Sequence, residues 1–161
     1  MIDALSYRRV VGRFATGVTV VTTRLDGEDH AMTCNSFTSV SLDPLLVLFC
    51  AEKIARFHDA VLTAGSWGVS VLSVGQEDAS RRFAHRGRAL EGQFDGVPVT
   101  PGRETSCVLL DGSAATLECR TVSVLDGGDH TVVLGEVVGL ALPDADVPPL
   151  LYVEGRYRTL A

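Results

Sequence analysis

Residues 33–44 read Thr33-Cys34-Asn35-Ser36-Phe37-Thr38-Ser39-Val40-Ser41-Leu42-Asp43-Pro44, a polar stretch that stands between two apolar ones. The flanking segments, 17–23 and 45–50, are rich in β-branched and aliphatic side chains and are typical of strands. Small hydroxyl and amide groups ordered by two strands can hydrogen-bond a polar ligand without adding charge. The same residue types are common at strand edges and turns, where they bond their own backbone. A ligand cradle and a structural turn are therefore both open.

In the rest of the chain, the order of apolar and polar residues predicts short strands, tight turns and three helices. Asp26-Gly27 is a hairpin turn signal, and residues 126–129 contain another. Gly65 is expected to end a helix. Residues 86–96 have little periodicity and are expected to form a loop. The predicted strands are residues 17–24, 30–36, 45–50, 66–72, 108–110, 114–124, 130–142, 150–153 and 157–160, and the predicted helices are residues 3–14, 53–62 and 76–85.

Many short strands with hairpin turns and few helices argue against a doubly wound α/β fold. We expect a mainly β protein, an antiparallel barrel with about three peripheral α-helices, formed by a single domain over residues 1–161. The sequence lacks the GxGxxG, GxxxxGKS/T and HExxH motifs. A dinucleotide that binds here therefore does not use the helix terminus of a Rossmann or P-loop fold.

The charge balance limits the classes of partner that the chain can bind. The chain has 20 Asp and Glu against 14 Lys and Arg, which gives a formal net charge of −6. This argues against binding to nucleic acid, and it means that an anionic ligand needs a local positive patch. No apolar run approaches the ~18 residues of a membrane span, and no signal-peptide pattern is seen at the N-terminus, so we expect a cytoplasmic protein. The cysteines lack metal-binding spacing and are expected to be free thiols.

Lys53 and Arg56 stand at the start of a predicted helix that follows a buried strand. The N-terminus of a helix attracts anions, and a basic side chain there adds charge for a phosphate. The alternative is that Glu52 and Arg56 form an ordinary ion pair at i,i+4 on the helix surface.

A second basic group lies at residues 81–88. Arg81 and Arg82 each follow an acidic residue by four positions, which favours a solvated helix face. Arg86 and Arg88 lack such a partner and are the better candidates for contact with the phosphates of a nucleotide.

The histidines show no metal-binding spacing. His130 follows a Gly-Gly-Asp turn at the start of a predicted strand. A histidine there can donate a hydrogen bond to a carboxamide or a pyrophosphate, or it can be a turn residue without a ligand.

Four separated motifs, taken together, carry a resemblance. They are Phe14-Ala15-Thr16-Gly17-Val18-Thr19-Val20-Val21-Thr22-Thr23; residues 35–44; Gly128-Asp129-His130 with Gly135-Glu136-Val137; and Pro149-Leu150-Leu151-Tyr152 with Gly155-Arg156-Tyr157. In this order, over nearly the whole chain, they resemble the short-chain flavin reductase family. The nearest resemblance is to the reductase components of two-component flavin-dependent monooxygenases.

The resemblance implies a Greek-key split β-barrel that forms a homodimer and binds FMN or FAD near the subunit interface. It also implies where the ligands contact this chain. The flavin contacts would be Thr33, Cys34, Asn35, Ser36, Phe37, Ser39 and Val40, with Lys53, Ile54, Ala55 and Arg56 near the ribityl phosphate and His85 or Arg86 closing the site. The nicotinamide nucleotide would meet the catalytic His130 and the segment with Tyr152, Gly155 and Tyr157.

The activity that the resemblance implies is that of an NAD(P)H:flavin oxidoreductase. It would transfer hydride from a nicotinamide nucleotide to free FMN or FAD and supply reduced flavin to a partner monooxygenase. Val153 and Glu154 depart from the family's C-terminal motif, and the Glu154 carboxylate favours NADH over NADPH, because an added 2′-phosphate would be repelled. Two alternatives stay open: a non-catalytic flavin-binding or electron-carrier protein of the same fold, and an unrelated β-barrel protein whose polar stretch is structural.

Overall fold

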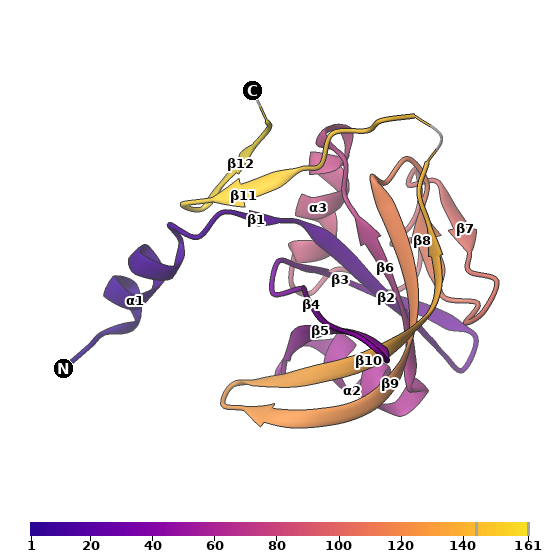
Figure 1. Cartoon of the computed structure of the whole chain (residues 1–161), viewed down its shortest axis with the longest axis horizontal. Helices are drawn as coiled ribbons and strands as arrows, with labels where there is room; N and C mark the ends of the chain where they lie inside the picture. Colours follow the sequence, from indigo (N-terminus) through magenta and orange to yellow (C-terminus); the bar gives the residue numbers. More distant parts are fainter. Residues whose placement is uncertain (144, 161) are drawn as a thin grey trace.

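The computed structural model describes residues 1–143 and 145–160 (Figure 1). The helices are α1 (Ala4–Val11), α2 (Arg56–Ala64) and α3 (Glu77–Ala84), with a short 3₁₀ turn η1 (Val74–Gln76). The strands are β1 (Thr16–Gly17), β2 (Thr19–Leu25), β3 (Glu28–Cys34), β4 (Thr38–Leu42), β5 (Leu45–Glu52), β6 (Ser66–Val71), β7 (Val99–Pro101), β8 (Val108–Leu110), β9 (Ala115–Gly127), β10 (His130–Ala141), β11 (Leu151–Val153) and β12 (Arg156–Arg158). The prediction of a mainly β protein with three helices is confirmed.

Seven of the strands form one antiparallel sheet in the order β3-β2-β6-β9-β10-β5-β4. Its two edge strands, β3 and β4, are consecutive in the chain and are joined by residues 35–37 alone. In a flat sheet the two edges would lie ~29 Å apart, because strands are spaced ~4.8 Å. The link from Cys34 to Thr38 can span at most ~14 Å. The sheet must therefore curl until the end of β3 lies near the start of β4, and residues 35–37 of the polar stretch form the seam between them.

Two small sheets complete the fold. One has the order β1-β11-β12, so the C-terminal strands return to the chain beside Thr16 and Gly17 (Figure 1). The other pairs β7 with β8. Helix α1 projects from the body beyond the β1-β11-β12 sheet and has no buried residue.

The core lies inside the curled sheet and continues under the helices. Trp67 of β6 is fully buried against Phe49 of β5, and Phe57 of α2 joins the same cluster. A Cβ atom on Gly135 of β10 would lie 2.4 Å from the Trp67 ring, so only glycine fits there. A second cluster, which includes Phe83 of α3, fills the space between that helix and the sheet.

The turns match their sequence signals. Asp26 and Gly27 have positive φ values of 52° and 84° between β2 and β3, as a type I′ hairpin requires. Gly65 ends α2 in the left-handed conformation at φ 68°. Asp3 accepts hydrogen bonds from the backbone N–H groups of Leu5 and Ser6 and so caps α1.

The structure corrects several predicted boundaries. The first helix ends at Val11 rather than residue 14. The second begins at Arg56, because residues 53–55 form a turn after β5, in which the Lys53 N–H donates to the Asp129 carbonyl and the Ala55 N–H donates to the Glu52 carbonyl. The third begins at Glu77, after the 3₁₀ turn. Strand β4 was not predicted, because it is short and mostly polar and stands inside the polar stretch, and its two apolar side chains, Val40 and Leu42, are exposed; β7 has only three residues.

Within residues 1–143 and 145–160, no helix is long and apolar enough to cross a membrane, and no group of three or more His, Cys, Asp or Glu side chains is placed to hold a metal ion. The four cysteines are free thiols, as the sequence predicts.

Candidate functional site

A cleft of about 920 Å³ opens beside the seam of the large sheet. It is lined by the end of β3 with Asn35 and Ser36, by the end of β5, by residues 54–57 and 83–88, and by the β9–β10 turn. Its volume suits a nucleotide-sized ligand.

The cleft is locally positive in an acidic chain. Four arginines line it, Arg8, Arg56, Arg86 and Arg88, against two carboxylates, Glu52 and Asp129. Such a balance attracts an anionic ligand and provides the positive patch that the charge of −6 makes necessary.

Ser36 ties the seam to the neighbouring strand. Its Oγ accepts from the Cys50 N–H at 3.0 Å and lies 3.4 Å from the Cys50 carbonyl oxygen. It also lies 3.0 Å from the Cys34 Sγ atom. Burial raises the pKa of the Cys34 thiol, so this thiol stays protonated and inert. Asn35 Nδ2 donates to Thr16 Oγ1 at 3.3 Å and links the seam to β1.

Arg88 fixes the segment that follows α3. Its guanidinium donates to the carbonyls of Phe83 and His85, each at 3.1 Å, and to the Ala31 carbonyl on β3. The Arg88 carbonyl in turn accepts from Arg56 Nη1 at 3.1 Å. Burial lowers the pKa of the half-buried Arg88, although the guanidinium keeps its charge at neutral pH. Arg88 therefore holds α3, β3 and α2 together around the cleft.

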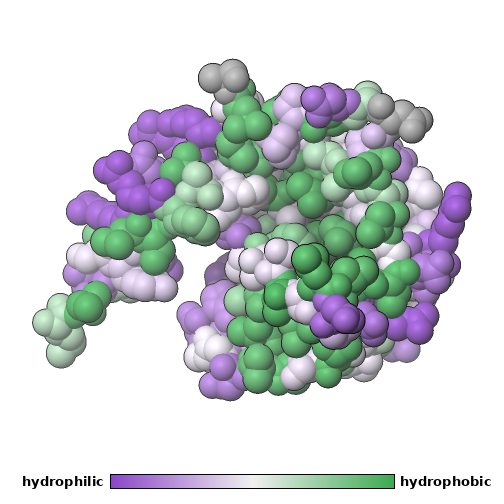
Figure 2. Space-filling view, in the orientation of Figure 1, coloured by the Kyte–Doolittle hydropathy of each residue, from purple (hydrophilic) through white to green (hydrophobic). Residues whose placement is uncertain are grey.

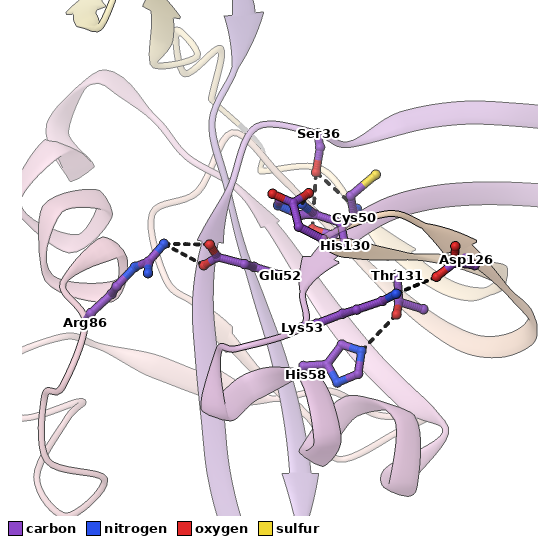
Figure 3. A network of polar contacts seen from close by, with 10 residues as sticks. Ser36, Cys50, Glu52, Lys53, His58, Arg86, Asp126, His130 and Thr131 are labelled. Carbon is purple, nitrogen blue, oxygen red and sulfur yellow. Dashed lines mark hydrogen bonds and ion pairs between the residues drawn. The ribbon is translucent and has the colours of Figure 1, made fainter. Parts of the chain in front are cut away.

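Arg86 reaches across the cleft to the end of β5 (Figure 3). Its Nη2 donates to both carboxylate oxygens of Glu52, at 2.6 and 2.7 Å. The alternative in which Glu52 pairs with Arg56 on a helix surface is wrong, because Glu52 belongs to β5 and Arg86 occupies its carboxylate.

His130 begins β10, in register with Glu52 on β5. Its Nδ1 lies 2.7 Å from Asp129 Oδ1, and the contact with His130 lowers the pKa of that exposed carboxyl. Because Nδ1 is engaged, Nε2 is the ring nitrogen available to a ligand in the cleft.

The cleft contains ten of the seventeen site residues that the sequence predicts. They are Thr33, Cys34, Asn35, Ser36, Ile54, Ala55, Arg56, His85, Arg86 and His130. Phe37, Ser39 and Val40 continue from the seam into β4, outside the lining. Their role in binding, like that of all seventeen, stays a prediction.

Four further predicted residues also lie outside the cleft. Lys53 pairs with Asp126 on the β9–β10 hairpin (Figure 3). Tyr152 and Tyr157 contact each other edge to face at 5.3 Å, and the Tyr157 hydroxyl bonds Ser80 on α3 at 2.7 Å. Gly155 sits in the turn between β11 and β12 with φ 73°, beside Glu154, whose carboxylate pairs with Arg13.

The basic residues of α3 itself do not line the cleft. Arg81 pairs with Glu77 at 2.6 Å and lies over the Tyr157 ring. Arg82 instead donates to backbone carbonyls of the following loop, so the predicted pair with Asp78 is wrong. The preference for Arg86 and Arg88 over these two agrees with the cleft lining.

Some lining residues were missed by sequence reasoning. Tyr7 and Arg8 reach the cleft from α1, and His30 and Met32 reach it from β3. No local signal marks the first pair, because their position depends on how α1 projects. The alternation along β3 could have placed His30, Met32 and Cys34 on one face.

His30 makes the stability of the fold depend on pH. Burial, followed by the nearby Arg56 charge, lowers the pKa of His30, and its buried Nδ1 has no partner among the described residues. The unfolded chain therefore binds more protons as pH falls below about 6.5, and stability should fall with it. In His30→Gln, the fall in melting temperature between pH 7.5 and pH 5.5 should be smaller than in the wild type. The difference should be no more than the ~2–4 °C that 1 kcal/mol produces. The exposed His85→Gln is the control and should leave the pH dependence of the melting temperature unchanged. The same unchanged dependence in His30→Gln would contradict the prediction.

Comparison with known proteins gives consistent matches. A family model described as "Flavin reductase like domain" matches residues 11–161. The NADH-dependent FAD reductase of Streptomyces globisporus is 44% identical over 160 residues, which cover 99% of this chain and 87% of that protein. HsaB of Mycobacterium tuberculosis, the reductase subunit of a flavin-dependent monooxygenase, is 40% identical over 157 residues, which cover 97% of this chain and 82% of that protein.

Among solved structures, the NADH:FAD oxidoreductase SgcE6 of Streptomyces globisporus C-1027, in complex with NAD and FAD fragments, is similar with a TM-score of 0.93. It is 44% identical, and the match covers 99% of this chain and 93% of that chain. The region that the family model matches contains every cleft-lining residue except those from α1.

Proposed function

The chain belongs to the flavin reductase-like domain family, and from that premise we propose that it is an NADH-dependent flavin reductase. It oxidises NADH, reduces free FAD or FMN, and supplies the reduced flavin to a partner monooxygenase. The observation that carries the proposal is the positive cleft of about 920 Å³ beside the polar seam. The seam residues Asn35 and Ser36 line it together with the arginines that a phosphate-bearing ligand needs.

The residues of the cleft fit both nucleotides. Asn35, Ser36 and Thr33 offer amide and hydroxyl groups to the polar edge of a flavin, and Arg56 and Arg86 offer charge to its phosphate. Because His130 Nδ1–H faces the Asp129 carboxylate, Nε2 of the neutral ring can accept from the carboxamide N–H of the nicotinamide nucleotide, and Nε2–H of the charged ring can donate to its pyrophosphate. The two ligands together supply the chemistry, hydride transfer from nicotinamide C4 to flavin N5. The chain's own residues hold the two rings together and exclude water, which is the main requirement of such a step.

The remaining site assignments rest on family resemblance. Phe37, Ser39 and Val40 extend the flavin contact along β4. Lys53 can contact the ribityl phosphate only after its ammonium group releases Asp126. Tyr152, Gly155 and Tyr157 contact the nicotinamide nucleotide from the C-terminal sheet. We also propose the finer description of the fold as a single-domain Greek-key split β-barrel, which the short link from β3 to β4 through residues 35–37 supports.

A homodimer is part of the proposal. Exposed apolar side chains gather on the neighbouring strands β4, β5, β10 and β9 and form a broad surface (Figure 2). They include Val40, Leu42, Leu45, Val122, Val124, Leu125 and Leu140. The projecting α1 adds Leu5, Val10 and Val11, which nothing in one chain covers. Surfaces of this extent mark interfaces. Light scattering should give twice the 17.1 kDa of the chain.

The decisive assay follows NADH oxidation with excess free FAD or FMN. Turnover of many flavin equivalents per protein is expected, faster with NADH than with NADPH. Flavin binding without turnover by either nucleotide would instead support the electron carrier. Absence of both binding and turnover would support an unrelated barrel.

A further inference from the structure

The ion pair between Arg86 and Glu52 joins two residues that line the cleft, and it can break without disturbing the fold. A single nitrogen, Nη2, meets both oxygens of Glu52, and the Arg86 side chain is 71% exposed. Glu52 is less accessible, at 27%. Exposed ion pairs of this kind stabilise a fold little, because water and salt screen them.

Arg86 is the cation that can change partners without disturbing the cleft. Arg88 is half-buried and bonds three backbone carbonyls, so moving it would release the segment after α3. Arg56 supports the same segment through the Arg88 carbonyl. Arg86 gives up one ion pair if it turns away, and its guanidinium suits a phosphate as well as a carboxylate.

We propose that Glu52 competes with the phosphate of the bound ligand for Arg86, and thereby sets how tightly the cleft holds its ligand. This inference rests on the proposed function, which supplies ligands that carry phosphate. With the cleft empty, Arg86 is paired to Glu52. A phosphate must displace Glu52 before it can use Arg86, and Glu52 recaptures Arg86 when the ligand leaves. Because the Arg86–Glu52 ion pair must break when the phosphate binds, its free energy is subtracted from the binding free energy of the ligand. A reductase that must release its product benefits from this weaker binding.

The first test compares ligands that differ by one phosphate. In Glu52→Gln, the dissociation constant for FMN should fall about 3- to 5-fold by calorimetry, because Arg86 is released. Riboflavin, which lacks the phosphate, should bind as it does to the wild type. ADP tests the nucleotide as the source of the phosphate, and a fall for FMN alone or for ADP alone identifies which ligand uses Arg86. An unchanged constant for both, or an equal fall for riboflavin, overturns the proposal.

A double-mutant cycle separates competition from plain repulsion of the phosphate by Glu52. Arg86→Ala should weaken binding about 5- to 10-fold, and adding Glu52→Gln to it should then change the affinity less than about 2-fold. Tightening that persists in the Arg86→Ala background overturns the proposal. Glu136→Gln, which removes an exposed charge outside the cleft, is the matched control and should leave every constant unchanged.

Two further measurements keep the test interpretable. If Glu52→Gln melts below the assay temperature, Glu52→Asp replaces it, since its shorter side chain loosens the pair and should give the same direction of change. NADH oxidation with free flavin is measured in parallel. Wild type that binds FMN without turnover contradicts the proposed function alone, whereas normal turnover with an additive cycle contradicts this inference alone.

Discussion

Replacing Trp67 by alanine should lower the free energy of unfolding by about 3–5 kcal/mol, the cost of removing a large aromatic side chain from a core. Trp67 is fully buried at the centre of the curled sheet. Its ring lies 4.8 Å from that of Phe49, and its Nε1 donates to Thr121 Oγ1 at 3.2 Å. The substitution removes the ring contact and the hydrogen bond, and leaves a cavity facing Gly135. In a chain of this size the melting temperature should fall by ~6–20 °C.

Urea unfolding followed by circular dichroism measures the effect. Trp67→Phe is the matched control, because it keeps an aromatic ring against Phe49 while losing the bond to Thr121, and it should cost about 1–2 kcal/mol. A loss below about 1 kcal/mol in Trp67→Ala would mean that the sheet does not close around this side chain. Because Phe57 shares the Trp67 cluster and also lines the cleft, the alanine variant should lose flavin binding as it melts.

The sequence predicted the elements that have their own local signal. Asp26-Gly27, Gly65 and the apolar run at residues 45–50 each fix a turn, a helix end or a strand through backbone preference or burial. Strand β4 gives no such signal, because its pairing with β5 leaves most of its side chains exposed. Helix α2 begins later than its amphipathic pattern, because the Lys53 N–H is bonded to the carbonyl of Asp129, which lies in the β9–β10 turn 76 positions along the chain.

The candidate site was predictable where it follows the chain and not where it depends on tertiary contacts. Residues 33–36 and 54–56 line the cleft as contiguous segments, as the family resemblance implies. The partner of Glu52 could not be inferred from i,i+4 spacing, since Arg86 arrives from 34 residues away. Arg8 lines the cleft from the projecting α1, whose direction no pattern in residues 4–11 specifies.

His130 is expected to have the largest effect on catalysis. His130→Ala should lower kcat/KM for NADH about 10- to 100-fold, because a hydrogen bond to a charged or strongly polar group contributes roughly 1.5–3 kcal/mol. The side chain is 40% exposed at the cleft, opposite Glu52 in the sheet. Its Nδ1 is held by Asp129, so the ring presents Nε2 to the ligand in a fixed orientation. On the proposed assignment, losing this side chain removes both a contact to the nicotinamide nucleotide and an alignment of its ring.

The geometry also predicts a graded series. Asp129→Asn keeps a hydrogen-bonding group beside Nδ1 and should lower kcat/KM less than His130→Ala does. Flavin affinity, measured with riboflavin, should stay unchanged in both variants, because the proposed contact of His130 is with the nicotinamide nucleotide. If His130→Ala keeps kcat/KM for NADH within 2-fold of wild type, or weakens riboflavin binding as much as NADH turnover, His130 is a turn residue or a flavin contact. In that case, nicotinamide alignment depends on the tyrosines of β11 and β12.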